Sequence, residues 1–190
     1  DFGTATIIHF TSGEATSNMV LYNVEEASIA ASDGTVNTPS DEQLAVSVSH
    51  AAGDYYEVTG NGSQTAGESQ TITVTLYDAY NNVATSITES RDLTFSGAGV
   101  ATSGDHPTVD ALNFGTATSL DFSSGAANGA MILYKVETAN INVSDGSLNV
   151  GNHKLSVDVG AAAATTLAIS RQPSPNATAG VDFGTQPVVH

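Results

Sequence analysis

Apolar and polar residues alternate with a period of two along much of the chain. In the segment 71–76, Ile72, Val74 and Leu76 share one face, and the threonines between them share the other. The alternation returns at 44–48, 141–143 and 155–159. A period of two places successive side chains on opposite faces of a strand, and Thr and Val fit a pleated, half-buried surface. The pattern therefore predicts β-strands rather than helices.

Turn-forming dipeptides separate these apolar runs. They are Asp33-Gly34, Asn61-Gly62, Asn128-Gly129 and Asp145-Gly146. Between residues 53 and 163 the pattern predicts strands at roughly 54–59, 69–77, 92–97, 117–122, 130–136, 139–144 and 153–159. Short strands with alternating faces and frequent turns predict a two-sheet β-sandwich. The alanine run 161–164 is too short for a helix and is predicted to be a linker.

The sequence repeats itself at a spacing of 112 residues. Gly3-Thr-Ala-Thr6 returns as Gly115-Thr-Ala-Thr118, and Met19-Val-Leu-Tyr22 returns as Met131-Ile-Leu-Tyr134. The first of these matches extends back to Asp1, which aligns with Asn113. The repeat is about 110 residues long, which is the size of one immunoglobulin-like sandwich.

This spacing predicts an all-β chain of tandem immunoglobulin-like sandwiches, in which one complete unit is flanked by two partial units. Residues 1–52 match the C-terminal part of a unit, 53–163 form one complete unit, and 164–190 match the N-terminal part of a following unit. The last part ends before any counterpart of the segment 76–112. No signal peptide is visible, and we expect an upstream segment to have been removed or to lie outside this sequence.

The segment 71–82, Thr-Ile-Thr-Val-Thr-Leu-Tyr-Asp-Ala-Tyr-Asn-Asn, followed by Leu-Thr-Phe-Ser-Gly at 93–97, resembles bacterial immunoglobulin-like repeats of the invasin and intimin kind. Those repeats carry an Asp-Ala-x-Gly-Asn turn after a Thr/Val strand, and here Asn81 stands at the usual Gly position. The segments 131–137 and 167–174 resemble the later strands and the interdomain connection of such arrays. The resemblance implies a surface-exposed stalk, adhesin, S-layer-like or filament protein of a prokaryote, and it brings no enzymatic residues.

The strongly acidic composition narrows the choice of partners. The formal net charge is −16, and the only Lys and Arg residues are Arg91, Lys135, Lys154 and Arg171. Nucleic acids and anionic membranes attract proteins through such cations, so neither is an expected partner. The chain has no Cys, which excludes a disulfide framework. No run approaches the ~20 apolar residues of a membrane span, so membrane insertion is not expected.

Oxygen-bearing side chains at predicted loops suggest a cation site. In a sandwich of this kind alternate loops gather at one end, which would bring Asp54, Asp78, Asn81 and Asp145 together. Oxygen ligands from several loops suit Ca²⁺, which would stiffen the joint between units. The alternative is that Asp and Asn only form turns here, since no dense Asp-x-Asp-x-Asp ladder is present. We expect no other cofactor.

Other candidate sites are sparse. The histidines are scattered, none has a partner at metal-ligand spacing, and no Gly-x-Ser-x-Gly elbow occurs, so no catalytic residue is assigned and no enzyme is expected. Three sequons make Asn61, Asn142 and Asn176 candidate glycosylation sites.

The combined pattern favours a structural repeat module that spaces or assembles an extracellular stalk, fibre or sheath. Segments 1–52 and 164–190 would expose unpaired strand edges. Either they belong to a longer array, which the missing middle strand favours, or neighbouring copies complete each other head to tail by strand addition. Expected partners are other copies or neighbouring repeats. The alternative function is an adhesin or glycan-binding module that recognises a host or surface glycan through exposed loops.

Overall fold

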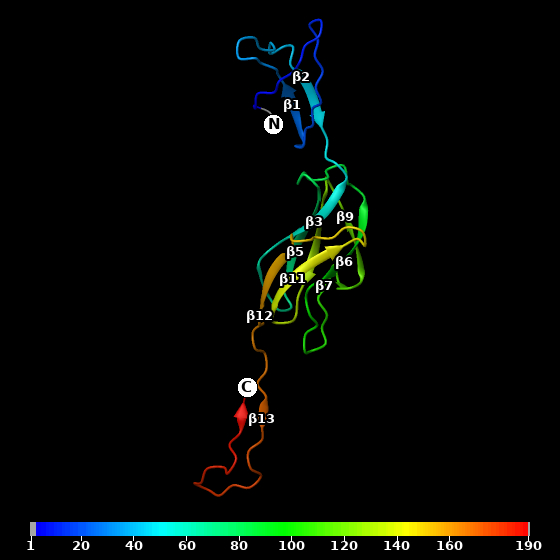
Figure 1. Cartoon of the computed structure of the whole chain (residues 1–190). Helices are drawn as coiled ribbons and strands as arrows, with labels where there is room; N and C mark the ends of the chain where they lie inside the picture. Colours follow the sequence, from blue (N-terminus) through cyan, green and yellow to red (C-terminus); the bar gives the residue numbers. More distant parts are fainter. Residues whose placement is uncertain (1–2, 190) are drawn as a thin grey trace.

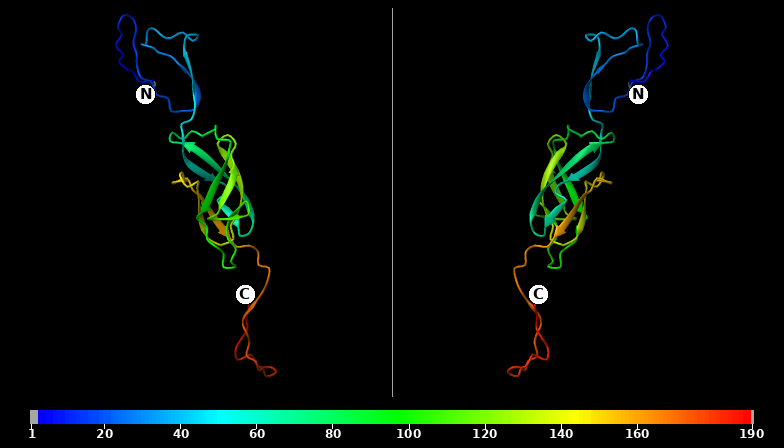
Figure 2. Two further views of the ribbon diagram at one scale, coloured as in Figure 1. Left: turned by 90° about the vertical axis from the view of Figure 1, so that its right-hand side faces the viewer. Right: turned by 90° about the vertical axis from the view of Figure 1, so that its left-hand side faces the viewer.

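The computed structural model describes residues 3–189, so Asp1 and Phe2, with which the first repeat block begins, and His190 lie outside the described residues. Every regular element between residues 3 and 189 is a β-strand. No helix in this range is long and apolar enough to cross a membrane. The chain forms an N-terminal hairpin segment, a central sandwich and a C-terminal hairpin segment, which follow one another in space (Figures 1 and 2).

Two five-stranded sheets make the sandwich. The first has the order β3-β5-β10-β7-β8, with bounds Gly53–Thr59, Ser69–Asp78, Ala126–Ile132, Thr108–Val109 and Leu112–Asn113. The second has the order β4-β12-β11-β6-β9, with bounds Ser63–Thr65, Leu155–Gly160, Thr138–Ser144, Ser90–Ser96 and Ala117–Asp121.

The strand order identifies the fold. The pairs within both sheets are antiparallel, except that β4 runs parallel to β12. The chain thus begins in the first sheet with β3, changes sheets through a short loop, and places β4 beside the final strand of the unit. The predicted all-β, immunoglobulin-like sandwich is confirmed.

The core lies between the two sheets. Alternate residues of β5 point inward, and Ile72, Val74 and Leu76 are buried as their period of two predicts. The facing sheet contributes Leu93 and Phe95 from β6, with further apolar residues from β11 and β12. Each fully buried side chain of this size contributes roughly 1.5–3 kcal/mol relative to exposure, which allows one unit to fold without disulfides.

The predicted strands of this unit are found with small shifts, and one turn prediction is wrong. Asn128-Gly129 lies inside β10 rather than in a turn, so the strand expected at 130–136 is observed four residues earlier. Gly129 serves close packing instead, because a Cβ on it would come within 2.8 Å of the Val109 side chain. Sequence reasoning also missed β4, β7 and β8, which are too short to show a periodic pattern.

Both flanking segments repeat strand pairs of the sandwich, the N-terminal one in the same register and the C-terminal one with a register shift between Ile169 and Arg171. In the N-terminal segment, β1 (Glu25–Ile29) pairs with β2 (Leu44–Val48), and Ile29 lies opposite Leu44 as Ile141 lies opposite Leu155. In the C-terminal segment, β13 (Ile169–Arg171) pairs with β14 (Val188–Val189). There, Ile169 lies opposite Val189 as Tyr56 lies opposite Leu76, at an offset of 113. The prediction that this part ends before any counterpart of residue 76 is therefore wrong by two residues, because Val189 and His190 match Leu76 and Tyr77.

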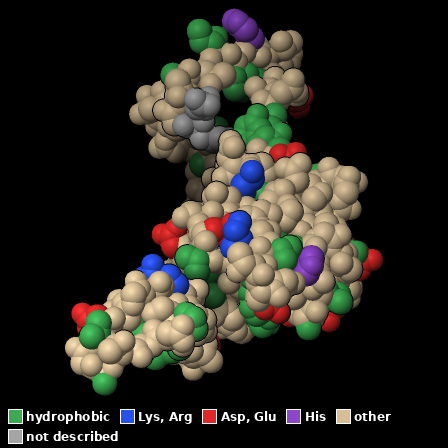
Figure 3. All heavy atoms as spheres, turned by 90° about the horizontal axis from the view of Figure 1, so that it is seen from below, with side chains coloured by type: hydrophobic (Ala, Val, Ile, Leu, Met, Phe, Trp, Pro, Cys, Tyr) green, Lys and Arg blue, Asp and Glu red, His purple; other side chains and the backbone are tan. Residues whose placement is uncertain are grey.

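In the flanking segments, a stretch that matches a strand of the sandwich does not form a strand when the same segment lacks the matching partner strands. Residues 14–20 match β10 and residues 5–9 match β9, but neither segment forms a strand. The partners of β10 and β9 in the sandwich are β5, β7 and β6, and residues 1–52 contain no counterpart of them. As a result Phe10 is 70% exposed, whereas its counterpart Phe122 is 3% exposed. Figure 3 shows apolar side chains, drawn in green, at several places on the surface.

Candidate functional site

The most connected polar site lies where the chain enters the sandwich. Asp78 ends β5, and the turn that follows it carries Tyr80 and Asn82. Two residues of the linker before β3, His50 and Ala51, contact this end of the sandwich. The N-terminal segment contributes its residues 22–24. We call this group of residues the entry joint.

Asp78 is the buried centre of the entry joint. Its carboxylate is fully buried and accepts hydrogen bonds from the backbone N–H groups of Tyr80 and Asn82 at 2.9 Å and of Ala51 at 2.8 Å. The Asn82 side-chain amide also donates to both carboxylate oxygens. Burial alone would raise the pKa of Asp78, but these hydrogen bonds outweigh it and lower the pKa to about 2.

Asn82 connects the sandwich to the preceding segment. Its Nδ2 donates to the carbonyl oxygen of Tyr22 at 2.7 Å, and its Oδ1 accepts from the N–H of Val24 at 3.1 Å. One amide therefore satisfies a backbone acceptor and a backbone donor two residues apart. The ring of Tyr22 packs on the ring of Tyr80 with centroids 4.8 Å apart and planes tilted by 54°. These contacts hold the backbone of residues 22–24 against the end of the sandwich.

His50 ties the linker to the sandwich by a second route. Its Nε2 accepts from the Ser86 N–H at 3.1 Å and contacts Ser86 Oγ at 2.8 Å, and its Nδ1 lies 2.6 Å from the Ala51 carbonyl oxygen. This arrangement assigns the ring hydrogen to Nδ1, because Nε2 must accept. A cleft of about 460 Å³ beside His50 separates strand β2 from the 85–86 loop and is lined by Glu25 and Glu26.

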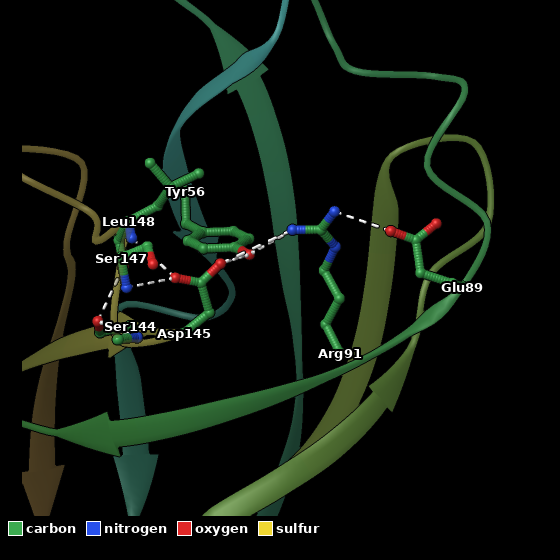
Figure 4. A network of polar contacts seen from close by, with 8 residues as sticks. Tyr56, Glu89, Arg91, Ser144, Asp145, Ser147 and Leu148 are labelled. Atoms are coloured by element: carbon green, nitrogen blue, oxygen red, sulfur yellow. Dashed lines mark hydrogen bonds and ion pairs between the residues drawn. The ribbon is translucent and has the colours of Figure 1, made fainter.

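A second polar cluster, which is partly exposed, bridges the two sheets of the sandwich (Figure 4). The Tyr56 hydroxyl donates to Asp145 Oδ2 at 2.8 Å, and Arg91 Nη1 lies 3.7 Å from the same oxygen. Arg91 Nη2 pairs with Glu89 at 2.8 Å. Burial, together with the hydrogen bond to Asp145, raises the pKa of Tyr56 to about 12 against the lowering effect of Arg91.

Asp145 is held in its ionised form within this cluster. Its Oδ1 accepts from the N–H groups of Ser147 and Leu148 at 2.8 and 2.7 Å. Burial raises the pKa of Asp145, but these bonds, the Tyr56 hydroxyl and the Arg91 charge together lower it. The cluster closes the β11–β12 turn onto the core and joins it to Tyr56 of β3 and Arg91 of β6.

The four residues predicted to bind Ca²⁺ do not all belong to one polar cluster. Asp78 and Asn81 share one turn, where Asn81 has a φ of 66° and its Oδ1 accepts from the Tyr55 hydroxyl at 2.9 Å. Asp145 belongs to the Arg91 cluster, and Asp54 is exposed on β3. Within residues 3–189 no group of three or more His, Cys, Asp or Glu residues is placed to hold a metal ion. Ca²⁺ binding by these four residues stays a prediction.

The candidate glycosylation sites differ in accessibility. Asn61 is exposed in the loop before β4, and Asn176 is exposed in the loop of the C-terminal hairpin. Asn142 is half-buried within β11, and its Nδ2 lies 3.4 Å from Ser96 Oγ on the neighbouring strand. Glycan attachment at these residues stays a prediction, and the two loop residues present the more accessible amides.

Comparison with known proteins gives only distant similarity. No protein-family model and no curated protein matches the sequence. The Lin-41 filamin domain is similar in structure, with a TM-score of 0.36 and 13% identity over 59% of this chain and 98% of that chain. Domains 4 and 5 of the S-layer protein SbsC are similar with a TM-score of 0.36 and 18% identity, over 63% of this chain and 59% of that chain. The immunoglobulin-like assignment therefore rests on the strand order described above.

Sequence reasoning found part of the entry joint and missed the rest. The Asp and Asn residues of the turn 78–82 were identified as loop residues at the domain connection. The bonds from Asn82 to Tyr22 and Val24 join residues about 60 positions apart, and no local pattern indicates them. The one available signal is the repeat itself, which gives Tyr22 and Val24 the counterparts Tyr134 and Val136 in the connection between β10 and β11.

Proposed function

We propose that this chain is a structural part of an extracellular, cell-surface protein of a prokaryote, in which immunoglobulin-like units in series space or assemble a stalk, fibre or sheath. The units contact their neighbours directly, as in other quasi-one-dimensional repeat proteins. The proposal includes no catalytic role. The acidic, cysteine-free composition supports it, because such a surface stays soluble through self-repulsion.

The observation that carries this proposal is the parallel pair β4·β12. The chain enters the sandwich at Gly53 and leaves it after Gly160, at opposite ends in Figure 1. Tension along the chain pulls β4, through β3, in one direction and β12 in the other. Because the two strands are parallel neighbours, their hydrogen bonds are sheared together rather than opened one after another.

Local contacts anchor this pair on both sides. The Asp158 N–H donates to the Gly62 carbonyl at 2.9 Å, and the Ala66 N–H donates to the Gly160 carbonyl at 2.8 Å. The buried Gln64 side chain donates to the Met131 carbonyl at 3.2 Å in the facing sheet. β4 and the last strand of the unit, β12, are thus fastened to each other and to the core, which suits a module that transmits tension.

The entry joint supports the same function. A spacer requires neighbouring units to keep a defined relation, and Asn82 and His50 fix the N-terminal segment and linker to the sandwich. A binding module at the tip of a protein has no such requirement for the end at which the chain enters.

Single-molecule force spectroscopy on the whole chain, tethered at its two ends, tests this proposal. We expect the sandwich to unfold in one step, after which residues 53–160 span roughly 360–390 Å when fully extended. The substitution Ala66→Pro removes the N–H that bonds to Gly160 and should lower the unfolding force. Thr102→Pro, in an exposed turn outside the β4·β12 pair, is the matched control. Unfolding without a resolvable force peak would contradict a mechanical role.

A further inference from the structure

The sandwich carries, at its exit end, a copy of the backbone segment that Asn82 holds at the entry joint. Residues 22–25 read Tyr-Asn-Val-Glu, and their counterparts 134–137 read Tyr-Lys-Val-Glu. The second segment lies at the end where the chain leaves the sandwich. There the Gly67 N–H donates to the Leu133 carbonyl, and the Val159 N–H donates to the Glu137 carbonyl, one residue before β12 ends.

The two copies differ in what binds them. At the entry joint, the carbonyl of Tyr22 and the N–H of Val24 both bond to Asn82. Within residues 3–189 no hydrogen bond reaches the carbonyl of Tyr134 or the N–H of Val136. The Val136 residue is also 62% exposed. The exit end therefore presents the same pair of backbone groups without a partner.

We infer that residues 134–136 are the docking surface for the Asp-Ala-Tyr-Asn-Asn turn of another immunoglobulin-like repeat, with the chemistry of residues 78–82. The last Asn of that turn binds the Tyr134 carbonyl and the Val136 N–H, and its Tyr packs on the Tyr134 ring. This inference rests on the proposed function, in which units follow one another. The segment 164–190 matches residues 51–77 and contains no counterpart of the turn 78–82.

The docking surface at residues 134–136 is held in place by the sandwich. Lys135 Nζ pairs with Glu137 Oε2 at 2.7 Å, and Glu137 Oε1 accepts from the Gly99 N–H at 2.6 Å. The ring of Tyr134 lies beside Gly67, where a Cβ would meet it at 4.0 Å. A surface ordered before docking loses less conformational entropy when the partner binds.

The length of the connection after the sandwich makes the orientation of the next unit depend on this docking contact. The offset between matching residues increases from 111 at Leu44 and Leu155 to 113 at Thr65 and Thr178. The second connection is therefore two residues longer than the linker of the entry joint. A longer linker leaves the next unit more orientations, so the contact at residues 134–136 has to select one of them.

Amide hydrogen exchange measured by NMR on an extended chain tests the inference. Residues 78–163 are appended after His190, so that 164–190 become the beginning of a second complete sandwich. We expect the Val136 amide to exchange at least tenfold more slowly in the extended chain than in the original one. Val24 serves as the internal reference, because its amide is bonded to Asn82 in both chains. Asn82→Ala in the appended copy should restore fast exchange at Val136 and leave Val24 unchanged.

Fast exchange at Val136 in an extended chain whose second sandwich is folded would overturn the inference. A second experiment decides the matter if the added unit does not fold. Asn23→Lys in the original chain gives residues 22–25 the sequence of residues 134–137, and we expect Val24 to stay protected. Loss of that protection, with the sandwich intact, would show that the sequence of residues 134–137 cannot accept the two hydrogen bonds from the Asn side chain. Neither hydrogen-exchange readout depends on the unfolding force. The docking inference can therefore be refuted while the mechanical proposal stands, and the mechanical proposal can be refuted while the docking inference stands.

Discussion

Met19 and Met131 occupy matching positions of the repeat but opposite environments. Met131 is fully buried in β10, which pairs with both β5 and β7, whereas Met19 is 44% exposed in a segment without strands. The sequence around them is nearly the same, Met-Val-Leu-Tyr against Met-Ile-Leu-Tyr. The burial of a residue in this chain therefore depends on which partner strands are present, rather than on its own local sequence.

This contrast predicts very different costs for one substitution at the two sites. Met131→Ala leaves a cavity in the core and should reduce the free energy of unfolding by about 2–5 kcal/mol. Met19→Ala, at a largely exposed site, should change it by less than about 0.5 kcal/mol. Urea unfolding followed by circular dichroism measures both. A cost at Met19 close to that at Met131 would show that another copy covers the N-terminal segment in solution.

Asn82→Ala should separate the N-terminal segment from the sandwich. The substitution removes both hydrogen bonds to residues 22–24, and we expect the Val24 amide to lose its protection from exchange. Residual dipolar couplings of β1·β2 and of the sandwich should then no longer fit one alignment tensor. Asn81→Gly is the control, because glycine accepts the φ of 66° at that position and only the bond to Tyr55 is lost. A common tensor in the Asn82 variant would mean that the remaining contacts of His50, Ala51 and Tyr22 fix the joint.

Asp78 should make stability depend on pH in the acid range. Its pKa is about 2 in the folded chain against an ordinary value of 3.8, so the folded state favours the ionised form. The stability that the ionised Asp78 carboxylate contributes is complete above about pH 4 and is lost as the pH falls toward 2. Asp78→Asn should be less stable at pH 7, and the difference from the unchanged chain should shrink between pH 4 and pH 2. Thermal unfolding across this range measures it, and a difference that does not vary with pH would contradict the assignment.

Tyr56 should give the opposite dependence at high pH. Its pKa is raised to about 12 from 10.0, so the folded state favours the protonated hydroxyl. Its contribution is complete below about pH 10 and is lost as the pH rises toward 12. Tyr56→Phe should cost about 1 kcal/mol at pH 7, since the bond to Asp145 is lost, and should remove this part of the alkaline dependence. Tyr134→Phe, at a half-buried residue, is the control.

Strand identity in the sandwich could be predicted because its long strands alternate strictly. β5 shows the pattern most clearly, and its Ile72, Val74 and Leu76 all lie in the core. The pattern failed at Gly129, where glycine makes room for a neighbouring strand instead of a turn. A dipeptide alone does not distinguish these two uses of glycine, because close approach depends on a residue far along the chain.

The candidate site was harder to predict because its members come from different strands. The sequence predicted that Asp78 and Asp145 lie in loops and grouped them around one cation. The structure places Asp78 at the last position of β5 and Asp145 just after β11. The structure gives each carboxylate its own set of N–H donors and places Arg91 beside Asp145. Arg91 stands in β6 without any local motif, so its pairing with Asp145 depends on how the sheets pack.

The autonomy of the β1·β2 hairpin has a consequence for the order of events during folding. Its register shows that the matching β11·β12 hairpin needs only its own residues, so this step closes a short loop and is fast. The β4·β12 pair instead joins residues at opposite ends of the unit, such as Ser63 and Asp158, and must close a long loop after β12 has been synthesised. We therefore expect a nascent unit to reach a compact state first and to gain its resistance to stretching only when its last strand arrives.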